Sequence, residues 1–468
     1  MIELEFIGGA RGVTGSKHIL RTSRAKVLLD CGMFQGRRRE SNERNRALEV
    51  PTGEIDAAVL SHAHIDHAGL LPLLYKRGYR GPIFATPATR DLCTPMLLDA
   101  ALIQEADARH IRKLIERDGL DMEPAEPLYD QDDVTGVLGL FMGLPYRRPH
   151  PIAPGITLKL FDAGHVLGSS IVVLDVDDEG DRVRVAYAVD LGRKGLPILR
   201  EPEIPGAVNC LVSESTYGDR RHAPIAQVDD ALAEAVNRTV ARSGKILIPA
   251  FALERAQEVV YALKRLRAAR KIAAVPVYVD SPLTVKLTDV FRMHPECYDK
   301  ATYASLVGGD PPFEFDGLHY VSDKEESKAI AAQPGPHIII AASGMCEAGR
   351  ILHHLREGVE DQRNTILIVG YQAQHTLGRR IVERQREVKV FGVIRKLLAE
   401  VVVLSGFSAH ADQNDLLTFA EAVREQGKLR QVVLVHGETP AQDALSAKLA
   451  EHGFPTVVVP GPGDRLRL

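Results

Sequence analysis

The most informative segment of the chain is residues 61–69, which read SHAHIDHAG. They follow a predicted buried strand and precede a predicted apolar helix. In extended backbone, side chains two positions apart point the same way, so His62 and His64 can converge on one metal ion. Asp66 and His67 lie where the chain turns into the helix, and they can face a second metal ion. The alternative is an ordinary polar loop, which four ligand-type side chains within six positions disfavour.

The composition is that of a globular protein. The chain has 468 residues, of which 45% are hydrophobic and 26% are charged, and this excludes a disordered or collagen-like chain. At roughly 100–200 residues per domain, the length indicates two or three domains. Lys and Arg total 58 against 62 Asp and Glu, a formal charge of −4. A nucleic-acid site must therefore be a local basic patch.

The sequence indicates a cytoplasmic protein that does not enter a membrane. Residues 1–6 (MIELEF) carry acids where a signal peptide needs a basic start. No apolar run approaches the roughly 18–20 residues that span a bilayer. The cysteines are too scattered and odd in number for a disulfide framework, which favours a reducing compartment. They are Cys31, Cys93, Cys210, Cys297 and Cys346.

The pattern of predicted elements changes twice along the chain. The first part is rich in strands, with one long helix at about 91–117. From about residue 220, strands alternate with amphipathic helices, which is typical of a parallel α/β sheet. After about residue 390 the first pattern resumes. We therefore predict an α/β protein in which one domain, residues 1–217 and 391–468, is interrupted by a second domain, residues 218–390.

The individual strands are predicted from apolar alternation or short apolar runs. In the first part they are at 2–8, 26–30, 57–61, 83–85, 157–162, 170–175, 183–190 and 207–214. In the middle part they are at 245–249, 275–280, 337–341 and 365–369, after a helix at 228–242. In the last part they are at 401–404, 432–436 and 456–459, and we group all three with the resumed first pattern.

The spacing in residues 61–69 resembles the signature of the metallo-β-lactamase superfamily. The resemblance implies that His165 is the third histidine of the first metal ion and that Asp190 bridges both ions. Asp30, which ends the predicted strand 26–30, is similar to the superfamily's first motif, where an aspartate orients the site from the second shell. The donor types favour zinc, with manganese or iron as alternatives.

Three further segments narrow the resemblance to the β-CASP nucleases. Residues 213–218 (SESTYG), 407–412 (FSAHAD) and 435–438 (VHGE) resemble motifs A, B and C of that branch. Residues 247–255, 342–345 and 370–373 resemble its inserted domain. The chain is most similar to bacterial and archaeal relatives of the cleavage and polyadenylation specificity factor endonuclease subunit. The implied fold is an αββα sandwich with an inserted α/β domain that contains a parallel sheet.

The resemblance implies a zinc-dependent ribonuclease with two Zn²⁺ ions per chain. Members that act on RNA tend to carry histidine in motif C, so His436 favours single-stranded RNA over DNA and is the last ligand of the second metal ion. His410 is the expected general acid and Glu214 its orienting partner, with Asp66 and Asp30 counted in the catalytic group. Hydrolysis of the phosphodiester would leave a 3′-hydroxyl and a 5′-phosphate.

Strand-to-helix turns in the inserted domain offer backbone N–H groups to phosphate. The expected RNA-phosphate contacts are Arg255, Ser343, Gly344, Met345 and Arg379, and ordinary αβ turns are the alternative. Relatives usually have Glu-Gly where this chain has Gln374-His375, which leaves the substrate preference of that loop open. The basic run at 37–39 follows Asp30 and could flank the cleft, with a solvated face as the usual interpretation of such a run. No KH-type extension is expected ahead of the first strand.

Three other functions account for part of the sequence. A small-substrate hydrolase would explain residues 62–190 but not the inserted domain or His410. A catalytically silent RNA-processing scaffold would lack metal ligands, which are all present here. A DNA-repair nuclease of the same branch is disfavoured by His436. The sequence leaves open endonuclease or 5′-exonuclease action, and family likeness is consistent with a homodimer.

Overall fold

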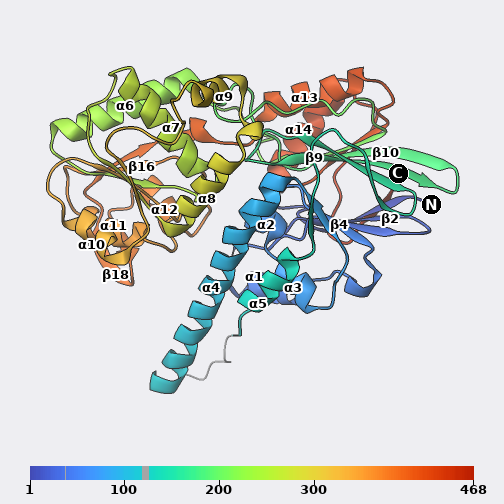
Figure 1. Cartoon of the computed structure of the whole chain (residues 1–468), viewed down its shortest axis with the longest axis horizontal. Coiled ribbons are helices and arrows are strands. Elements are labelled where there is room, and N and C mark those ends of the chain that lie inside the picture. Colours follow the sequence, from blue (N-terminus) through green and yellow to red (C-terminus); the bar gives the residue numbers. More distant parts are fainter. Residues whose placement is uncertain (37, 119–125) are drawn as a thin grey trace. The chain divides into compact units, whose positions relative to one another are not determined.

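The chain folds into two compact units. The computed structural model describes residues 1–36, 38–118 and 126–468. The first unit comprises residues 1–194, 201–221 and 410–468, and the second comprises residues 195–200 and 222–409 (Figure 1). The first unit is therefore built from both ends of the chain. The domain boundaries that we predict from the sequence, at residues 217 and 390, stay a prediction.

Two seven-stranded sheets form the first unit. The order in the first sheet is β22 (Arg465–Arg467), β1 (Glu3–Gly8), β2 (Lys17–Arg21), β3 (Lys26–Leu29), β4 (Ala57–Val59), β5 (Ile83–Ala85) and β6 (Phe141–Gly143). The order in the second is β21 (Val457–Val458), β20 (Gln431–Leu434), β11 (Cys210–Ser213), β10 (Asp181–Ala188), β9 (Ser170–Asp178), β8 (Ile156–Asp162) and β7 (His150–Ala153). Each sheet is antiparallel on one side and parallel on the other: β3 to β6, and β10 to β21, run parallel.

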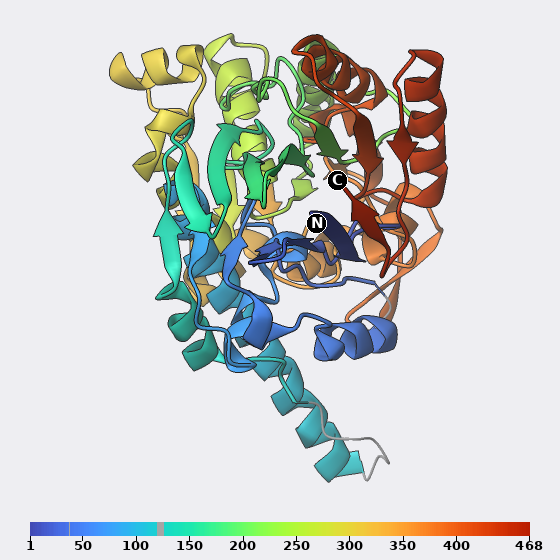
Figure 2. The same cartoon turned by 90° about the vertical axis from the view of Figure 1, so that its right-hand side faces the viewer.

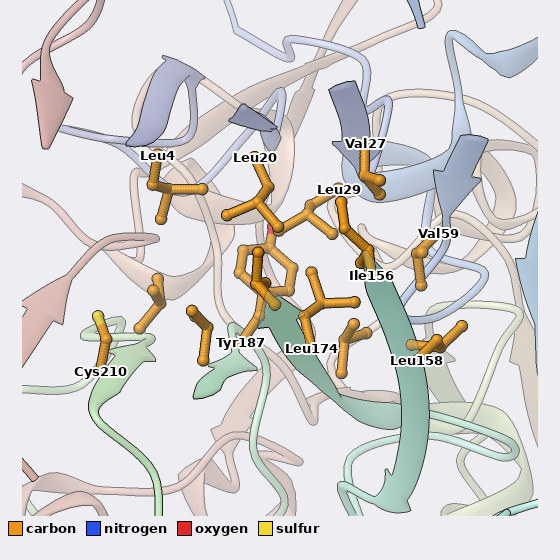
Figure 3. Packing of buried hydrophobic residues seen from close by; sticks show 14 of the residues in the cluster. Leu4, Leu20, Val27, Leu29, Val59, Ile156, Leu158, Leu174, Tyr187 and Cys210 are labelled. Atoms are coloured by element: carbon orange, nitrogen blue, oxygen red, sulfur yellow. The ribbon is translucent and has the colours of Figure 1, made fainter. Parts of the chain in front are cut away.

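The two sheets bury their facing side chains against each other. Along β8, Ile156, Leu158 and Leu160 are buried and alternate with partly exposed residues, as the period of a strand requires. Figure 3 shows Leu158 and Leu174 from the second sheet meeting aliphatic side chains of the first. Burial of this apolar surface is the main source of stability for the unit, at roughly 25 cal/mol per Å².

Helices cover the outer faces of both sheets, which completes the expected αββα sandwich. Helices α13 (Gln413–Glu425) and α14 (Thr439–Glu451) pack on the second sheet (Figure 2). Asp412 and Asp415 form a capping box that begins α13. The helices on the side of the first sheet are α1 (Arg38–Ala47), α2 (Ile65–Ala68), α3 (Leu71–Lys76), α4 (Pro87–Asp118) and α5 (Gln131–Leu138).

The second unit contains the expected parallel sheet, with six strands. Their order is β14 (Leu318–Val321), β13 (Val277–Asp280), β15 (Ile338–Ala341), β12 (Ile246–Pro249), β16 (Thr365–Ile368) and β19 (Glu400–Val403). The helices are α6 (Ile225–Ala241), α7 (Arg255–Ala268), α8 (Pro282–Met293), α9 (Lys300–Val307), α10 (Lys324–Ala332), α11 (Ile351–Gly358) and α12 (Leu377–Val382). A hairpin of β17 (Glu387–Val390) and β18 (Val393–Lys396) forms a separate two-stranded sheet, and its Val388 and Val390 pack into the core of the unit.

The structure corrects one strand assignment and adds strands that the sequence does not signal. The predicted strand 401–404 corresponds to β19, which pairs in parallel with β16 in the second unit and not with the first unit's sheets. The sequence does not predict β2, because its residues, KHILR, show no alternation of apolar and polar side chains. Its two polar residues Lys17 and His18 are nevertheless buried. In the basic run 37–39, Arg37 lies outside the described residues, and α1 begins at Arg38. No helix in the described ranges is both long and apolar enough to span a bilayer.

The sheet-to-sheet core gives a direct stability prediction. Leu174 is 1% exposed between the sheets, so Leu174→Ala should lower the free energy of unfolding by about 2–5 kcal/mol. The matched control is Leu102→Ala on α4, where the side chain is 45% exposed, and its effect should stay within about 0.5 kcal/mol. Urea denaturation measures both. Equal effects of the two substitutions would contradict the assignment of this core.

Candidate metal centre

Three histidines and an aspartate form a first group of metal-ligand atoms. His62 Nε2 lies 3.0 Å from His64 Nδ1, and His165 Nε2 lies 3.4 Å from the same atom. Asp190 Oδ2 is 3.3 Å from the Nε2 atoms of both His62 and His165. Four ligands at about 2.0–2.1 Å from a tetrahedral zinc ion are themselves about 3.3–3.4 Å apart. The separations therefore fit one tetrahedral ion.

A second group consists of Asp66, His67 and His436. The Nε2 atoms of His67 and His436 are 3.2 Å apart, and His436 Nε2 is 3.7 Å from Asp66 Oδ2. Asp190 also reaches this group, because its Oδ2 lies 3.6 Å from His67 Nε2 and its Oδ1 lies 3.1 Å from His436 Nδ1. One carboxylate thus touches both groups.

Strand ends bring these side chains together. His62 and His64 follow β4, and Asp66 and His67 lie on the short helix α2. Asp190 follows β10, and His436 follows β20 with a positive φ of 49°. The remaining ligand-type residue, His165, lies in the loop from β8 to β9. Because parallel strands end at the same edge of a sheet, residues far apart in the chain meet there.

The carboxylate of Asp30 supports one histidine of each ligand group, His67 directly and His62 through Ser61. Its Oδ2 accepts hydrogen bonds from the Ser61 hydroxyl at 2.9 Å and the Tyr187 hydroxyl at 3.0 Å, and lies 2.8 Å from His67 Nδ1. The Ser61 hydroxyl is also 3.0 Å from Nδ1 of His62. Because Nδ1 is engaged in each ring, the Nε2 atoms of His62 and His67 are left to face the ligand groups, as when a carboxylate or hydroxyl behind a metal-binding histidine fixes the orientation of its ring.

The electrostatics of the site suit a cation. Burial lowers the pKa of His64 to about 3 and that of His165 well below its usual value, so both rings are neutral, as metal ligands must be. Burial alone would lower the pKa of His67, but Asp190 and Asp30 raise it to about 10. The same carboxylates favour a metal cation. Asp190 Oδ1 and His165 Nδ1 are buried and make no hydrogen bond of acceptable geometry within the described chain, although Asp190 Oδ1 lies 3.1 Å from His436 Nδ1. These residues fit a bound metal pair.

His410 and Glu214 lie beside the first group. His410 Nδ1 is 3.1 Å from Glu214 Oε2, and the His410 ring lies 4.5 Å from that of His165 between centroids. The other Glu214 oxygen accepts a hydrogen bond from the backbone N–H of Leu191 at 2.6 Å. Burial lowers the pKa of His410, but Glu214 overrides this and raises it to about 9. His410 does not belong to either ligand group.

The predicted phosphate contacts lie in the second unit, and one of them is buried. Arg255 begins α7, is 8% exposed and pairs with Glu258. This favours a structural role for Arg255 over contact with phosphate. The sequence could not indicate this, because the pairing follows from which helix face is covered.

Of the other predicted phosphate contacts, three lie nearer the surface: Ser343, Met345 and Arg379. Ser343 and Met345 are partly exposed after β15, while Gly344 is packed against Phe251. Gln372 Nε2 donates to the carbonyl oxygen of Gly344 at 2.9 Å. Arg379, in the first turn of α12, pairs with Glu383 at 2.7 Å. Each of these residues lies where a strand ends or a helix begins. Their contacts neither support nor oppose a role in binding phosphate.

Sequence reasoning missed the residues that support the ligands. Tyr187 lies in an otherwise apolar strand, and nothing in its local pattern shows that its hydroxyl reaches Asp30 across the gap between the sheets. Ser61 likewise has no signal of its own in the sequence beyond its place before His62, although its hydroxyl links Asp30 to that ring.

A four-layer αββα sandwich with two adjoining His/Asp groups at its strand ends defines a metallohydrolase type of protein. Three family models match the chain: the metallo-beta-lactamase superfamily at residues 15–83, the Beta-Casp domain at 256–381, and the Zn-dependent metallo-hydrolase RNA specificity domain at 395–460.

Comparisons with individual proteins agree with these matches. The chain is 37% identical to ribonuclease TTHA0252 of Thermus thermophilus over 95% of both chains. It is 31% identical to transcription termination factor FttA of Thermococcus kodakarensis, over 100% of this chain and 71% of that protein. A crystal structure of a protein of unknown function from Enterococcus faecalis shares the fold, with a TM-score of 0.56 at 12% identity over 100% of both chains. The chain belongs to the β-CASP branch of the metallo-β-lactamase superfamily.

The Asp30 contacts predict an effect on metal affinity. In Asp30→Asn, an amide replaces the carboxylate that orients His67 and Ser61, so zinc affinity should fall about 10–100-fold. Competition with a chromogenic chelator measures this. Asp181→Asn, at an exposed position at the start of β10, is the matched control and should leave the affinity unchanged. Unchanged zinc binding in Asp30→Asn would show that the carboxylate does not orient the ligands.

Proposed function

We propose that the chain is a metal-dependent ribonuclease that hydrolyses phosphodiester bonds of single-stranded RNA at a site with two zinc ions. The contact of Asp190 with both ligand groups carries this proposal, because a carboxylate shared by two adjoining groups can hold two ions close together, as in the two-metal sites of phosphatases and nucleases. The relatives named ribonuclease and transcription termination factor support RNA as the substrate.

The first ion would be held by His62, His64, His165 and Asp190. The second would be held by Asp66, His67, His436 and Asp190. Zinc is favoured because the donors are imidazole and carboxylate and the spacing of the first group suits a tetrahedral ion. When bound, the ions would supply an activated water and neutralise charge on the phosphoryl oxygens.

His410 is the proposed proton donor to the departing 3′ oxygen. Glu214 engages its Nδ1, which leaves Nε2 as the ring atom for proton transfer. The backbone N–H of Leu191 holds the other Glu214 oxygen in place, so the pair is fixed on both sides. Protonation of the 3′ oxygen would leave a 3′-hydroxyl on one product and a 5′-phosphate on the other.

The remaining expectations from the sequence belong to the same proposal. Ser343, Gly344, Met345 and Arg379 are proposed to contact backbone phosphates of the RNA. Such contacts would recognise the strand without reading its bases. A homodimer, a cytoplasmic location and the boundaries at residues 217 and 390 stay predictions.

The substrate class is tested by cleavage of 5′-labelled oligonucleotides. We expect about two zinc ions per chain by metal analysis, cleavage of single-stranded RNA and not of DNA, and loss of cleavage after chelation that zinc restores. Internal fragments would indicate endonuclease action, and released mononucleotides would indicate exonuclease action. Cleavage of DNA in place of RNA, or of neither polymer, would overturn the proposal.

The role of His410 is tested by substitution. His410→Ala should lower kcat for RNA about 10²–10⁴-fold because the leaving oxygen loses its proton donor, while the zinc content stays that of the wild type. His452→Ala is the control, since His452 is an exposed histidine of the same unit that pairs with Glu421. Loss of zinc from His410→Ala would instead indicate a ligand role, and full activity would contradict the assignment.

A further inference from the structure

The loop Gly9–Ser16 borders the second ligand group. It connects β1 to β2, and both of its ends are fixed to residues of that group. The backbone N–H of His436 donates to the carbonyl oxygen of Gly9 at 2.7 Å, and the backbone N–H of Ser16 donates to the carbonyl oxygen of Asp66 at 2.9 Å. The loop therefore runs from one proposed ligand of the second ion to another.

Several backbone N–H groups of the loop have no hydrogen-bond acceptor. The backbone N–H groups of residues 10–15 donate to no other group in the parts of the chain that the structure describes. Its early carbonyl oxygens, in contrast, are used: Ala10 accepts from Gln442 Nε2 at 2.6 Å, and Gly9 accepts from His436. A run of unpaired N–H groups in a turn with positive-φ residues is a common anion-binding arrangement. Gly9 and Gly15 have φ values of 70° and 74°.

The loop also carries a positive charge. Arg11 is exposed, and its Nη2 donates to the carbonyl oxygen of Val459 at 3.1 Å. Within the described residues no carboxylate pairs with it, so four of its five N–H donors and its full charge are available to a ligand. Arginine suits a phosphate because its donors match two phosphoryl oxygens at once.

The shape of the loop is fixed before any ligand binds. A Cβ on Gly15 would lie 2.4 Å from the Phe34 ring, and a Cβ on Gly9 would lie 3.0 Å from the Ser16 Cα. Asn45 holds the backbone of Phe34 with two hydrogen bonds, of 2.8 and 3.0 Å. The crest of the loop is open, since a Cβ on Gly12 would meet nothing within 4 Å.

We propose that the loop Gly9–Ser16 binds a backbone phosphate of the RNA strand next to the bond that is cut. The donors are the backbone N–H groups of residues 11–14, which are exposed or partly exposed, and the Arg11 guanidinium. A phosphate held there would lie beside the group of Asp66, His67 and His436, to which the loop is tied. This inference rests on the proposed ribonuclease function and assigns a binding role to a loop outside both ligand groups.

Two glycine variants test the loop without disturbing the fold. Gly12→Val adds a side chain into open space on the crest, where it would collide with a bound strand. Gly53→Val is the matched control: Gly53 is in the same unit, also meets nothing within 4 Å and also lacks a positive φ. We expect KM for single-stranded RNA to rise about 10-fold or more in Gly12→Val, a loss of uniform binding with kcat little changed, and no change in Gly53→Val.

Two further readouts separate binding from damage to the metal centre. Zinc content and hydrolysis of bis(p-nitrophenyl) phosphate, which has no neighbouring phosphate, should equal the wild type in both variants. Arg11→Gln should weaken RNA binding and make the slope of log K against log salt shallower by about 0.7, the value for one single-strand phosphate contact. Arg182→Gln, at a side chain 82% exposed on β10, is the control for a lost surface charge.

The outcomes distinguish this inference from the proposed function. If the wild type cleaves RNA and Gly12→Val behaves like Gly53→Val, the loop has no role in binding and the inference is overturned, while the ribonuclease stands. If the wild type cleaves no RNA, the proposed function fails, and the loop is judged by fluorescence anisotropy with a labelled single-stranded RNA. Weaker binding in Gly12→Val and Arg11→Gln then supports the loop as a phosphate site, and unchanged binding overturns it.

Discussion

The carboxylate of Asp30 is the contact on which the geometry of the site depends. One oxygen, Oδ2, receives the hydroxyls of Ser61 and Tyr187 and lies against the imidazole of His67. Because Ser61 also reaches His62, the same carboxylate orients a ligand of each proposed metal ion. The other oxygen, Oδ1, accepts the backbone N–H of Ser61 at 2.8 Å, so Asp30 cannot rotate away. One histidine of each ligand group is thus held, directly or through Ser61, by the same buried carboxylate.

A buried cluster of this kind is unfavourable without a compensating charge. Asp30, Asp190 and Glu214 are all nearly inaccessible to water, and so are most of the histidines around them. Removing carboxylates from water costs several kcal/mol each unless they are paired. A protonated imidazole can supply part of the compensating positive charge. The pKa of His67 is raised for this reason, because Asp190 and Asp30 stabilise its protonated form. Two divalent cations would supply it more completely, which is the physical reason why this arrangement suits metals.

The two units make different contributions in the proposed ribonuclease. The first holds every member of both ligand groups, together with His410 and Glu214. The second offers the partly exposed residues Ser343 and Arg379, but its Arg255 pairs with Glu258. The arginine side chains of the second unit would therefore contribute less to binding the RNA than the sequence suggests. The loop Gly9–Ser16 adds donors in the first unit itself.

The amino-acid sequence by itself determined where most of the strands lie and which donor-type side chains gather in residues 61–69. Both follow from short-range patterns, because apolar periods indicate strands and residues 61–69 carry four donor-type side chains within six positions. The layers of the fold and the other proposed ligands were implied by the family resemblance. Tertiary structure alone decided which distant groups support them. Tyr187 reaches Asp30 from the opposite sheet, Gly9 meets the backbone of His436, and β19 joins β16. The sequence near these residues does not indicate these contacts, because each one joins two segments that are far apart in the chain and meet only in the folded structure.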